Sequence, residues 1–211
     1  MKEDILEQAV NDWLLSQPGT FTKHNVKFKP SKDDPKFKEG TDAVNSDIDV
    51  LAIHKKKKGV SRVSAASCKS WQNGFSVEGW YTKLKDPNIK VNRREAWRYF
   101  REIAVRKWGK ALAKKIFEET GSKNFTYYLV VTKLNGKNLN NSIWKFENDK
   151  VFLNNLKYDS KSKVRIRIIT FKEIFTDHFQ RLKLKTLEAT ELGRLIQIVK
   201  ASGVKLMGID E

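Results

Sequence analysis

The stretches DIDVLAI (residues 47–53) and RVSAASCK (residues 62–69) decide the fold of this chain. The first is rich in aliphatic and β-branched residues, and such a run between polar segments is typical of a strand. The second predicts a further strand, and the basic turn from His54 to Gly59 leads into it. A connection of about eight residues between two strands indicates a hairpin.

The segments before the hairpin predict a helix, a strand and a loop. Apolar residues recur at helical spacing over residues 5–14, and Pro18-Gly19 should end that helix. Residues 20–28 alternate well enough for a strand. Residues 29–46 contain Pro30, Pro35 and Gly40 among many charges, which predicts a long, mobile surface loop.

The segments after the hairpin alternate between helical and strand patterns. They predict a helix over 92–120 broken near Gly109, a central strand over 125–132, a loop over 135–141, a strand over 164–171, a helix over 171–184, and a last helix with an apolar stripe over 192–199 that ends at Gly203. This order predicts one α/β domain over residues 1–211, with a central mixed sheet flanked by helices. Residues 1–132 would hold the core motifs, and residues 133–211 further strands and C-terminal helices.

Composition excludes several classes of protein. The hydrophobic fraction of 39% is too high for a disordered chain. The sequence has no apolar run long enough for a transmembrane helix, and its acidic beginning, MKEDILEQAV, does not resemble a signal peptide. The single cysteine, Cys68, rules out an internal disulfide and fits a reducing compartment. We therefore expect a cytoplasmic protein.

The net charge points to a polyanionic partner. The 42 Lys and Arg residues exceed the 25 Asp and Glu residues by 17, and the isoelectric point is about 9.8. Solubility alone typically needs a net charge of only about 2 to 8. Because the basic residues occur throughout the chain rather than along one amphipathic helix, nucleic acid is a better candidate than a membrane surface.

The hairpin also brings chemistry-bearing residues together. Alternation along a strand places Asp47 and Asp49 on one face, and likewise Ser67 and Lys69. If the two strands present the same face, an acid and a lysine meet beside the backbone carbonyl of Cys68. Carboxylate and carbonyl oxygens are ligands suited to Mg²⁺, and an ammonium beside a metal-bound water can position that water.

These residues resemble the motifs of the PD-(D/E)XK, or restriction-endonuclease-like, nuclease superfamily. The matching strings are SDIDVLAI, with Asp49 as the metal-binding acid, and AASCKSW, with Lys69 as the catalytic lysine. Glu7 would correspond to the first-helix glutamate that completes the metal site in many members. The resemblance covers residues 1–75, or 1–132 with the central strand.

The resemblance implies a Mg²⁺-dependent DNA endonuclease, a hydrolase of phosphodiester bonds in which Mn²⁺ should substitute for Mg²⁺. Glu7, Asp49 and the Cys68 carbonyl would hold the metal. A restriction-type enzyme is the leading expectation, and a Holliday-junction-type resolvase is the nearest alternative. Because cutting both strands of a duplex commonly needs two active sites, a homodimer is one expected assembly. RNA stays open as a substrate.

Ser67 departs from the superfamily pattern, which has an acid two residues before the lysine. Some restriction enzymes of the superfamily have serine there and take a glutamate from the helix that follows the lysine. Glu78 and then Asp86 are the nearest downstream acids. The departure also leaves open a degenerate member that binds nucleic acid without cutting it.

Each candidate has an ordinary structural explanation as well. Asp47 can be a turn cap, Lys69 a solvated edge residue, Cys68 a small buried residue and Gln72 the start of a turn. The three histidines are widely scattered, which makes a zinc site improbable.

Two basic segments are the candidate contacts to nucleic acid. The first is the turn of four lysines, Lys55, Lys56, Lys57 and Lys58. The second is the flank of the predicted helix that carries Arg94, Arg98 and Arg101. Both could contact phosphates without reading sequence, and both could equally be solvated surfaces.

Overall fold

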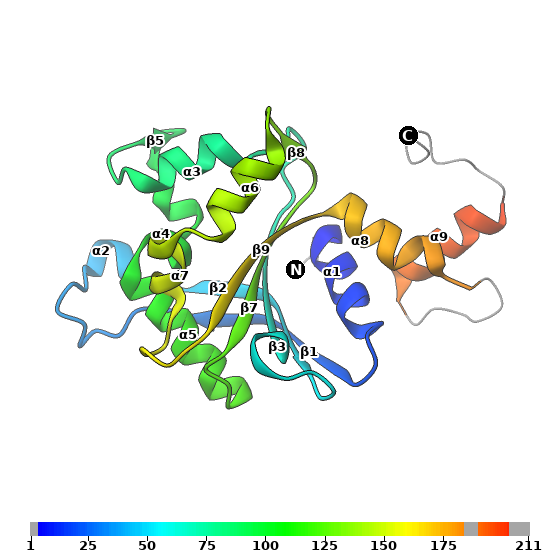
Figure 1. Ribbon diagram of the computed structural model, residues 1–211, viewed down its shortest axis with the longest axis horizontal. Helices are drawn as coiled ribbons and strands as arrows, with labels where there is room; N and C mark the ends of the chain where they lie inside the picture. Colours follow the sequence, from blue (N-terminus) through cyan, green and yellow to red (C-terminus); the bar gives the residue numbers. More distant parts are fainter. Residues whose placement is uncertain (1–3, 184–189, 203–211) are drawn as a thin grey trace.

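A mixed sheet of five strands forms the centre of the fold. In the computed structural model, which describes residues 4–183 and 190–202, the strands lie in the order β1-β2-β3-β7-β9 (Figure 1). They are β1 (Thr20–Phe28), β2 (Ser46–His54), β3 (Val63–Lys69), β7 (Phe125–Val131) and β9 (Val164–Thr170). β1, β2 and β3 pair antiparallel, whereas β3, β7 and β9 pair parallel. The predicted α/β class with a central mixed sheet is confirmed.

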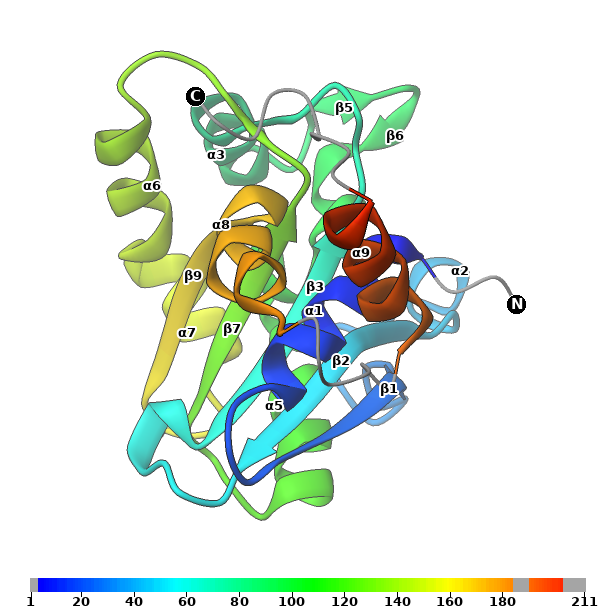
Figure 2. The same ribbon diagram turned by 90° about the vertical axis from the view of Figure 1, so that its right-hand side faces the viewer.

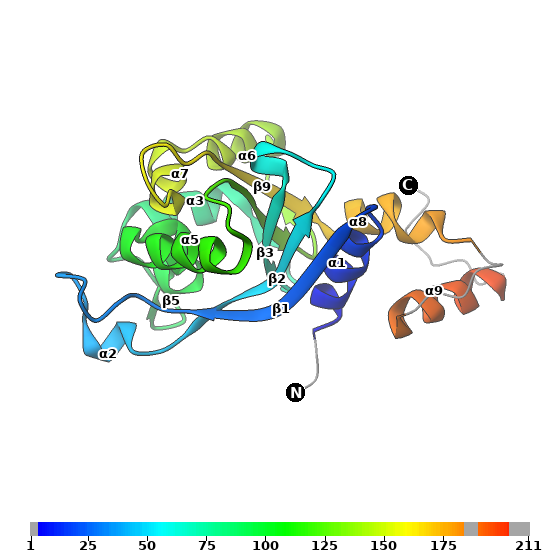
Figure 3. The same ribbon diagram turned by 90° about the horizontal axis from the view of Figure 1, so that it is seen from below.

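Helices cover both faces of this sheet (Figures 1 and 3). One face carries α1 (Ile5–Leu15), α8 (Phe171–Asp177) and, further out, α9 (Glu191–Ala201). Figure 2 looks onto this face and shows α1 lying across the strands. The other face carries α3 (Val77–Lys85), α4 (Arg101–Ala104), α5 (Arg106–Thr120), α6 (Leu139–Glu147) and α7 (Lys150–Leu156).

Strand alternation divides the buried residues into two hydrophobic cores. In β3, Val63 and Ala65 pack towards α5, whereas Ala66 packs towards α1. In β7, likewise, Tyr127 lies in the core on the α5 side of the sheet and Val130 in the core on the α1 side. Since neighbouring strands share these faces, this alternation places Ser67 and Lys69 of β3 on the face of Ala65 and Cys68 on the face of Ala66.

Most of the elements predicted from local patterns are confirmed. The first helix, the strand over 20–28, the antiparallel hairpin, the interior strand β7 and the strand β9 lie where the sequence placed them. The helix predicted over 171–184 is shorter, because α8 ends at Asp177 and a 3-10 turn (Phe179–Arg181) follows. α9 confirms the last helix, but Gly203, its predicted end, and residue 184 lie outside the described residues.

The helix predicted over 92–120 is wrong in its first part, whereas α5 (Arg106–Thr120) confirms its second half. The chain there forms a small hairpin of β5 (Lys90–Val91) and β6 (Arg94–Glu95), a 3-10 turn (Ala96–Tyr99), then α4 and α5. The hairpin turns through Asn92 and Arg93, which both have positive φ. The helical break lies at the extended residue Val105, while Gly109 sits inside α5.

Gly109 is required for packing rather than for a break. A Cβ placed on it would lie 2.2 Å from the Asn155 carbonyl oxygen and 2.5 Å from that of Glu102. Both distances are far below van der Waals contact, so any side chain would push α5 away from α4 and α7. The glycine therefore fixes how closely these three helices approach.

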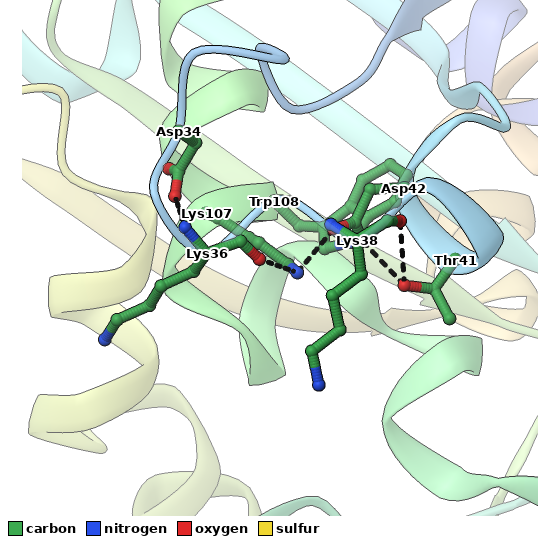
Figure 4. A network of polar contacts seen from close by, with 7 residues as sticks. All are labelled: Asp34, Lys36, Lys38, Thr41, Asp42, Lys107 and Trp108. Carbon is green, nitrogen blue, oxygen red and sulfur yellow. Dashed lines mark hydrogen bonds and ion pairs between the residues drawn. The ribbon is translucent and has the colours of Figure 1, made fainter.

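The segment 29–46, predicted as a mobile loop, is held against the body of the protein. It contains the short helix α2 (Glu39–Asp42), and the fully buried Asp42 ion-pairs with Lys107 of α5 (Figure 4). The sequence likewise missed α6 and α7, and the stretch in which α6 begins, NGKNLNN (135–141), has the composition of a loop. It includes the end of β8 (Leu134–Asn135), which pairs with β4 (Phe75–Ser76), and the start of α6. No helix in the described ranges is long and apolar enough to cross a membrane.

Candidate active site at the split between strands β2 and β3

The candidate site lies where β2 and β3 separate. Their ladder runs from Ile53–Val63 to Val50–Ala66, and β3 then continues beside β7 as far as Lys69. Just beyond the last β2–β3 pair, Asp49 Oδ2 accepts a hydrogen bond from the Cys68 backbone N–H at 2.5 Å. A carboxylate thus replaces the next rung of the ladder and is held between the two strands.

Burial makes the charge of Asp49 costly. Its side chain is 8% exposed, and burial raises its pKa to about 6, although Lys69 and the Cys68 amide act in the opposite direction. The negative charges of Asp47 and Glu102 raise the pKa further. Asp47 itself is exposed, so the two aspartates of the motif differ: one is buried at the split and the other faces solvent.

A chain of hydrogen bonds leads from Lys69 to a second carboxylate. Lys69 Nζ donates to Ser67 Oγ at 3.1 Å, and the Ser67 hydroxyl interacts with the hydroxyl of Tyr127. The Tyr127 hydroxyl donates to Glu102 Oε1 at 2.5 Å. Ser67 is therefore connected to an acid supplied by α4.

Glu102 is the site residue that sequence reasoning missed. It is 6% exposed and close enough to Asp49 for their charges to repel. It lies 33 residues beyond Lys69, farther along the chain than Glu78 and Asp86, the two downstream acids predicted from the sequence. Its setting in RYFREIAV was a usable signal. The apolar neighbours Phe100 and Ile103 indicate a buried segment, and a carboxylate is rarely buried without a purpose.

The two downstream acids proposed from the sequence have other contacts. Glu78 Oε2 on α3 accepts a hydrogen bond from Ser142 Oγ at 3.0 Å. Asp86 Oδ1 accepts from the Asn88 backbone N–H at 2.9 Å, as in a turn. Gln72 is exposed in the turn that follows β3.

Glu7 lies on α1, which covers the opposite face of the sheet from Ser67 and Lys69. Its carboxylate acts electrostatically on the Cys68 thiol, which faces α1. Burial first, then the charges of Asp49 and Glu7, raise the pKa of that thiol well above its usual range. Such a thiol stays protonated, which argues against a cysteine nucleophile. A metal-binding role for Glu7 stays a prediction.

The donor set at the split fits a hard cation. In an extended strand the N–H and C=O of one residue point to the same side, so the Cys68 carbonyl points with its N–H towards Asp49. Asp49 and this carbonyl are oxygen donors at the split, and Glu102 is a further oxygen donor near enough to repel the charge of Asp49, which Mg²⁺ would neutralise. Within residues 4–183 and 190–202, no three His, Cys, Asp or Glu side chains are grouped to hold a metal. Water and substrate oxygens would have to complete the coordination.

The four lysines from Lys55 to Lys58 lie at the other end of the hairpin. Lys55 lies six positions beyond Asp49 along extended backbone, which corresponds to roughly 20 Å. Lys57 Nζ donates to Gln17 Oε1, and Lys55 Nζ lies over the Phe21 ring at 4.7 Å. The sequence correctly placed these lysines on the hairpin that carries Asp49, but the fold does not bring them beside it.

The three arginines come from different elements rather than from one helix flank. Arg94 lies on β6, Arg98 in the 3-10 turn and Arg101 on α4. Each guanidinium lies over an aromatic ring, that of Tyr99, Trp97 or Trp108 respectively. Arg94 and Arg98 are near enough to repel the charge of Arg101, and Arg98 also ion-pairs with Glu95 at 2.8 Å. Because Arg101 precedes Glu102, this arginine cluster borders the candidate site.

Comparisons with protein-family models, with curated proteins and with solved structures found no match to this chain.

Proposed function

We propose that this chain is a Mg²⁺-dependent DNA endonuclease of the PD-(D/E)XK type, which hydrolyses phosphodiester bonds. One observation carries the proposal. At the split between β2 and β3, Asp49 accepts the amide of Cys68, while Lys69 is linked through Ser67 and Tyr127 to the buried Glu102. A restriction-type enzyme stays the leading form of the proposal, with a junction resolvase as its alternative. The net charge of +17 supports a nucleic-acid substrate.

Each residue of this arrangement would have a separate role. Asp49, the Cys68 carbonyl and Glu102 would hold Mg²⁺, which supplies a nucleophilic water at neutral pH and neutralises charge on the phosphate. Lys69 would stabilise the negative charge that grows on the phosphate oxygens, as a fixed ammonium does best in a site with little water. Ser67 would keep the Lys69 ammonium in place, and Tyr127 would orient Glu102.

Glu102 is proposed as the acid that Ser67 lacks. Its burial, its hydrogen bond from Tyr127 and its repulsion of Asp49 support this role. Glu7 is the competing candidate, since it stands on the first helix. The two candidates differ in the face of the sheet from which they approach, and single substitutions separate them.

A protein that binds nucleic acid without cutting it is the second candidate. Ser67 occupies the position of an acid, and the described residues hold no ready group of three metal-binding side chains. In that case Asp49 and Glu102 would serve the structure alone. Binding would then persist while metal-dependent cleavage is absent.

Nicking of supercoiled plasmid with Mg²⁺ or Mn²⁺ tests the proposal. Asp49→Asn, Lys69→Met and Glu102→Gln should each lower the rate by about 100-fold or more, as loss of one charge-stabilising group commonly does. Glu102→Gln keeps an oxygen that accepts from Tyr127, so its fold should persist. Glu78→Gln is the matched control, because it changes a glutamate on the same side of the sheet that contacts Ser142 instead.

The control should cut at the wild-type rate. If Glu102→Gln cuts normally while Glu7→Gln is inactive, the acid is supplied by α1 and the role given to Glu102 is wrong. If the wild-type protein binds duplex DNA but cuts neither plasmid nor four-way junctions with either metal, the endonuclease proposal fails and the binding protein takes its place.

A further inference from the structure

Arg101 carries a charge that the fold does not satisfy. Its guanidinium lies 4.6 Å from the centre of the Trp108 ring, and its NH1 atom is buried without a hydrogen-bond partner among the described residues. Arg106, five residues on, shows the usual alternative: its NH1 donates to the carbonyl oxygens of Asn155 at 2.8 Å and Lys157 at 2.7 Å. Arg101 as a whole is only partly buried, but a buried N–H group without an acceptor is disfavoured, so the position of its NH1 atom needs a reason.

Neighbouring charges make this position less favourable still. Burial and then repulsion by Arg94 and Arg98 oppose the positive charge of Arg101. The attractions of Glu102 and Asp42 are each weaker than the repulsion from either arginine. Asp42 is also compensated by Lys107 and accepts from Trp108 Nε1, and Glu102 accepts from Tyr127. The hydrogen bonds and the ion pair of these two acids are therefore made to residues other than Arg101.

Arg98 joins this cluster to a basic cleft. The cleft has a volume of about 670 Å³ and runs between the β5–β6 hairpin, α7 and the segment around α2. Its charged lining residues are five cations and one acid: Lys38, Lys85, Lys90, Arg98, Lys107 and Glu95. Arg98 ion-pairs with Glu95 at 2.8 Å, Lys85 with Asp149 and Lys107 with Asp42, so cations still exceed acids around the cleft. Figure 4 shows the Lys38 side chain pointing away from the Asp42 network, although its backbone N–H is part of that network. The surroundings of the arginine cluster thus favour an anion.

We propose that Arg101, with Arg98 and Arg94, forms a subsite for a backbone phosphate of nucleic acid. A phosphate oxygen would accept from the guanidinium groups of this cluster, and its charge would offset the repulsion that Arg94 and Arg98 exert on Arg101. Arg101 and Glu102 are consecutive on α4, so a phosphate held by Arg101 would position the strand relative to Asp49. The identity of the ligand rests on the proposed function, but the subsite is tested by binding alone.

The test is the binding of a fluorescent DNA duplex, measured by anisotropy in EDTA so that no cleavage occurs. Arg101→Met keeps an unbranched side chain over Trp108 and removes the charge. Its affinity should fall about tenfold, and the slope of log K against log salt should decrease by about 0.9, the value for one lost phosphate contact. Its melting temperature should stay equal or rise, because the substitution removes a partly buried charge that Arg94 and Arg98 repel.

Lys161→Met is the matched control, since it removes the same charge from the exposed turn before β9, at the opposite end of the parallel strands. It should leave affinity nearly unchanged. Arg98→Met serves as a second variant and should lower the salt slope in the same way. Inorganic phosphate tests the shared chemistry: it should raise the melting temperature of the wild-type protein more than that of Arg101→Met.

Equal losses of affinity in Arg101→Met and Lys161→Met would show that only net charge matters, and would overturn the subsite. So would a marked fall in melting temperature of Arg101→Met with an unchanged salt slope in both arginine variants, because Arg101 would then be a structural residue. Failure of the protein to cut DNA, together with the expected change in slope, would remove the nuclease and leave the phosphate subsite in place.

Discussion

Replacement of Asp42 by Asn should reveal how strongly the segment around α2 is held to α5. Asp42 is fully buried and ion-pairs with Lys107. It also accepts hydrogen bonds from the Lys38 N–H at 2.7 Å, Thr41 Oγ1 at 3.2 Å and Trp108 Nε1 at 3.2 Å (Figure 4). Burial alone would raise the pKa of Asp42, but Lys107 and the Lys38 N–H outweigh burial and lower it.

The expected loss of unfolding free energy follows from the lysine that Asn leaves without its anion. Its amide keeps one acceptor oxygen but removes the charge, so Lys107, whose side chain is 11% exposed, would lie almost buried without an anion. Removal of one member of a buried pair costs about 3 to 5 kcal/mol. Because Lys107 Nζ also donates to the Lys36 carbonyl oxygen at 2.8 Å, we expect the lower end, about 3 kcal/mol.

Urea denaturation of the wild type, Asp42→Asn, Lys107→Met and the double variant measures this coupling. The loss of unfolding free energy in the double variant should be smaller than the sum of the two single losses by at least about 2 kcal/mol. The reason is that neither charge is left buried without its partner. A loss below about 1 kcal/mol in Asp42→Asn, or strictly additive losses, would refute the reasoning and return residues 29–46 to a loosely held loop.

Two further predictions concern His54 and Gly109. His54 is buried between Thr20 Oγ1 (2.8 Å) and Ser64 Oγ (2.9 Å), and burial lowers its pKa from 6.5 to about 4. The unfolded state then binds the extra proton, so the stability contributed by neutral His54 is complete above pH 6.5 and decreases by up to roughly 3 kcal/mol as the pH falls to about 4. His54→Gln should flatten the pH dependence of the unfolding free energy in that window, and an unchanged dependence would contradict the assignment. Gly109→Ala should cost about 2 kcal/mol or more and slow cleavage, because α5 must move away from the Glu102 and Asn155 carbonyls. Gly40→Ala, which meets no atom within 4 Å, should be nearly neutral in the same melting experiment, and equal losses in both would argue against the packing role.

Local patterns were sufficient for the elements that repeat a simple period. The helix over 5–14 and the strands over 20–28, 47–53 and 125–132 each bury one face or both, so their sequences follow the periods of helix and strand. The hairpin placed Asp49, Cys68 and Lys69 together for the same reason. These features depend on residues close in sequence.

The rest of the site depends on contacts that sequence spacing does not show. The turn at Asn92 and Arg93 uses positive φ without glycine, so a helix was predicted across it. Glu102 reaches the site only because Gly109 lets α5 pack closely against α4. Its carboxylate there accepts a hydrogen bond from Tyr127, which lies on β7, the strand beside β3. Neither relation is visible until the chain between Lys69 and Tyr127 is folded.

A crystal of the protein soaked in Mn²⁺, examined for anomalous scattering, tests the central claim most directly. We predict one strong peak at the split between β2 and β3, about 2.2 Å from oxygens of Asp49, Glu102 and the Cys68 carbonyl. A peak held by Asp49 and Glu7 without Glu102 would move the second acid to α1. The absence of any peak at Asp49, at Mn²⁺ concentrations that support cleavage, would contradict a metal-dependent site there.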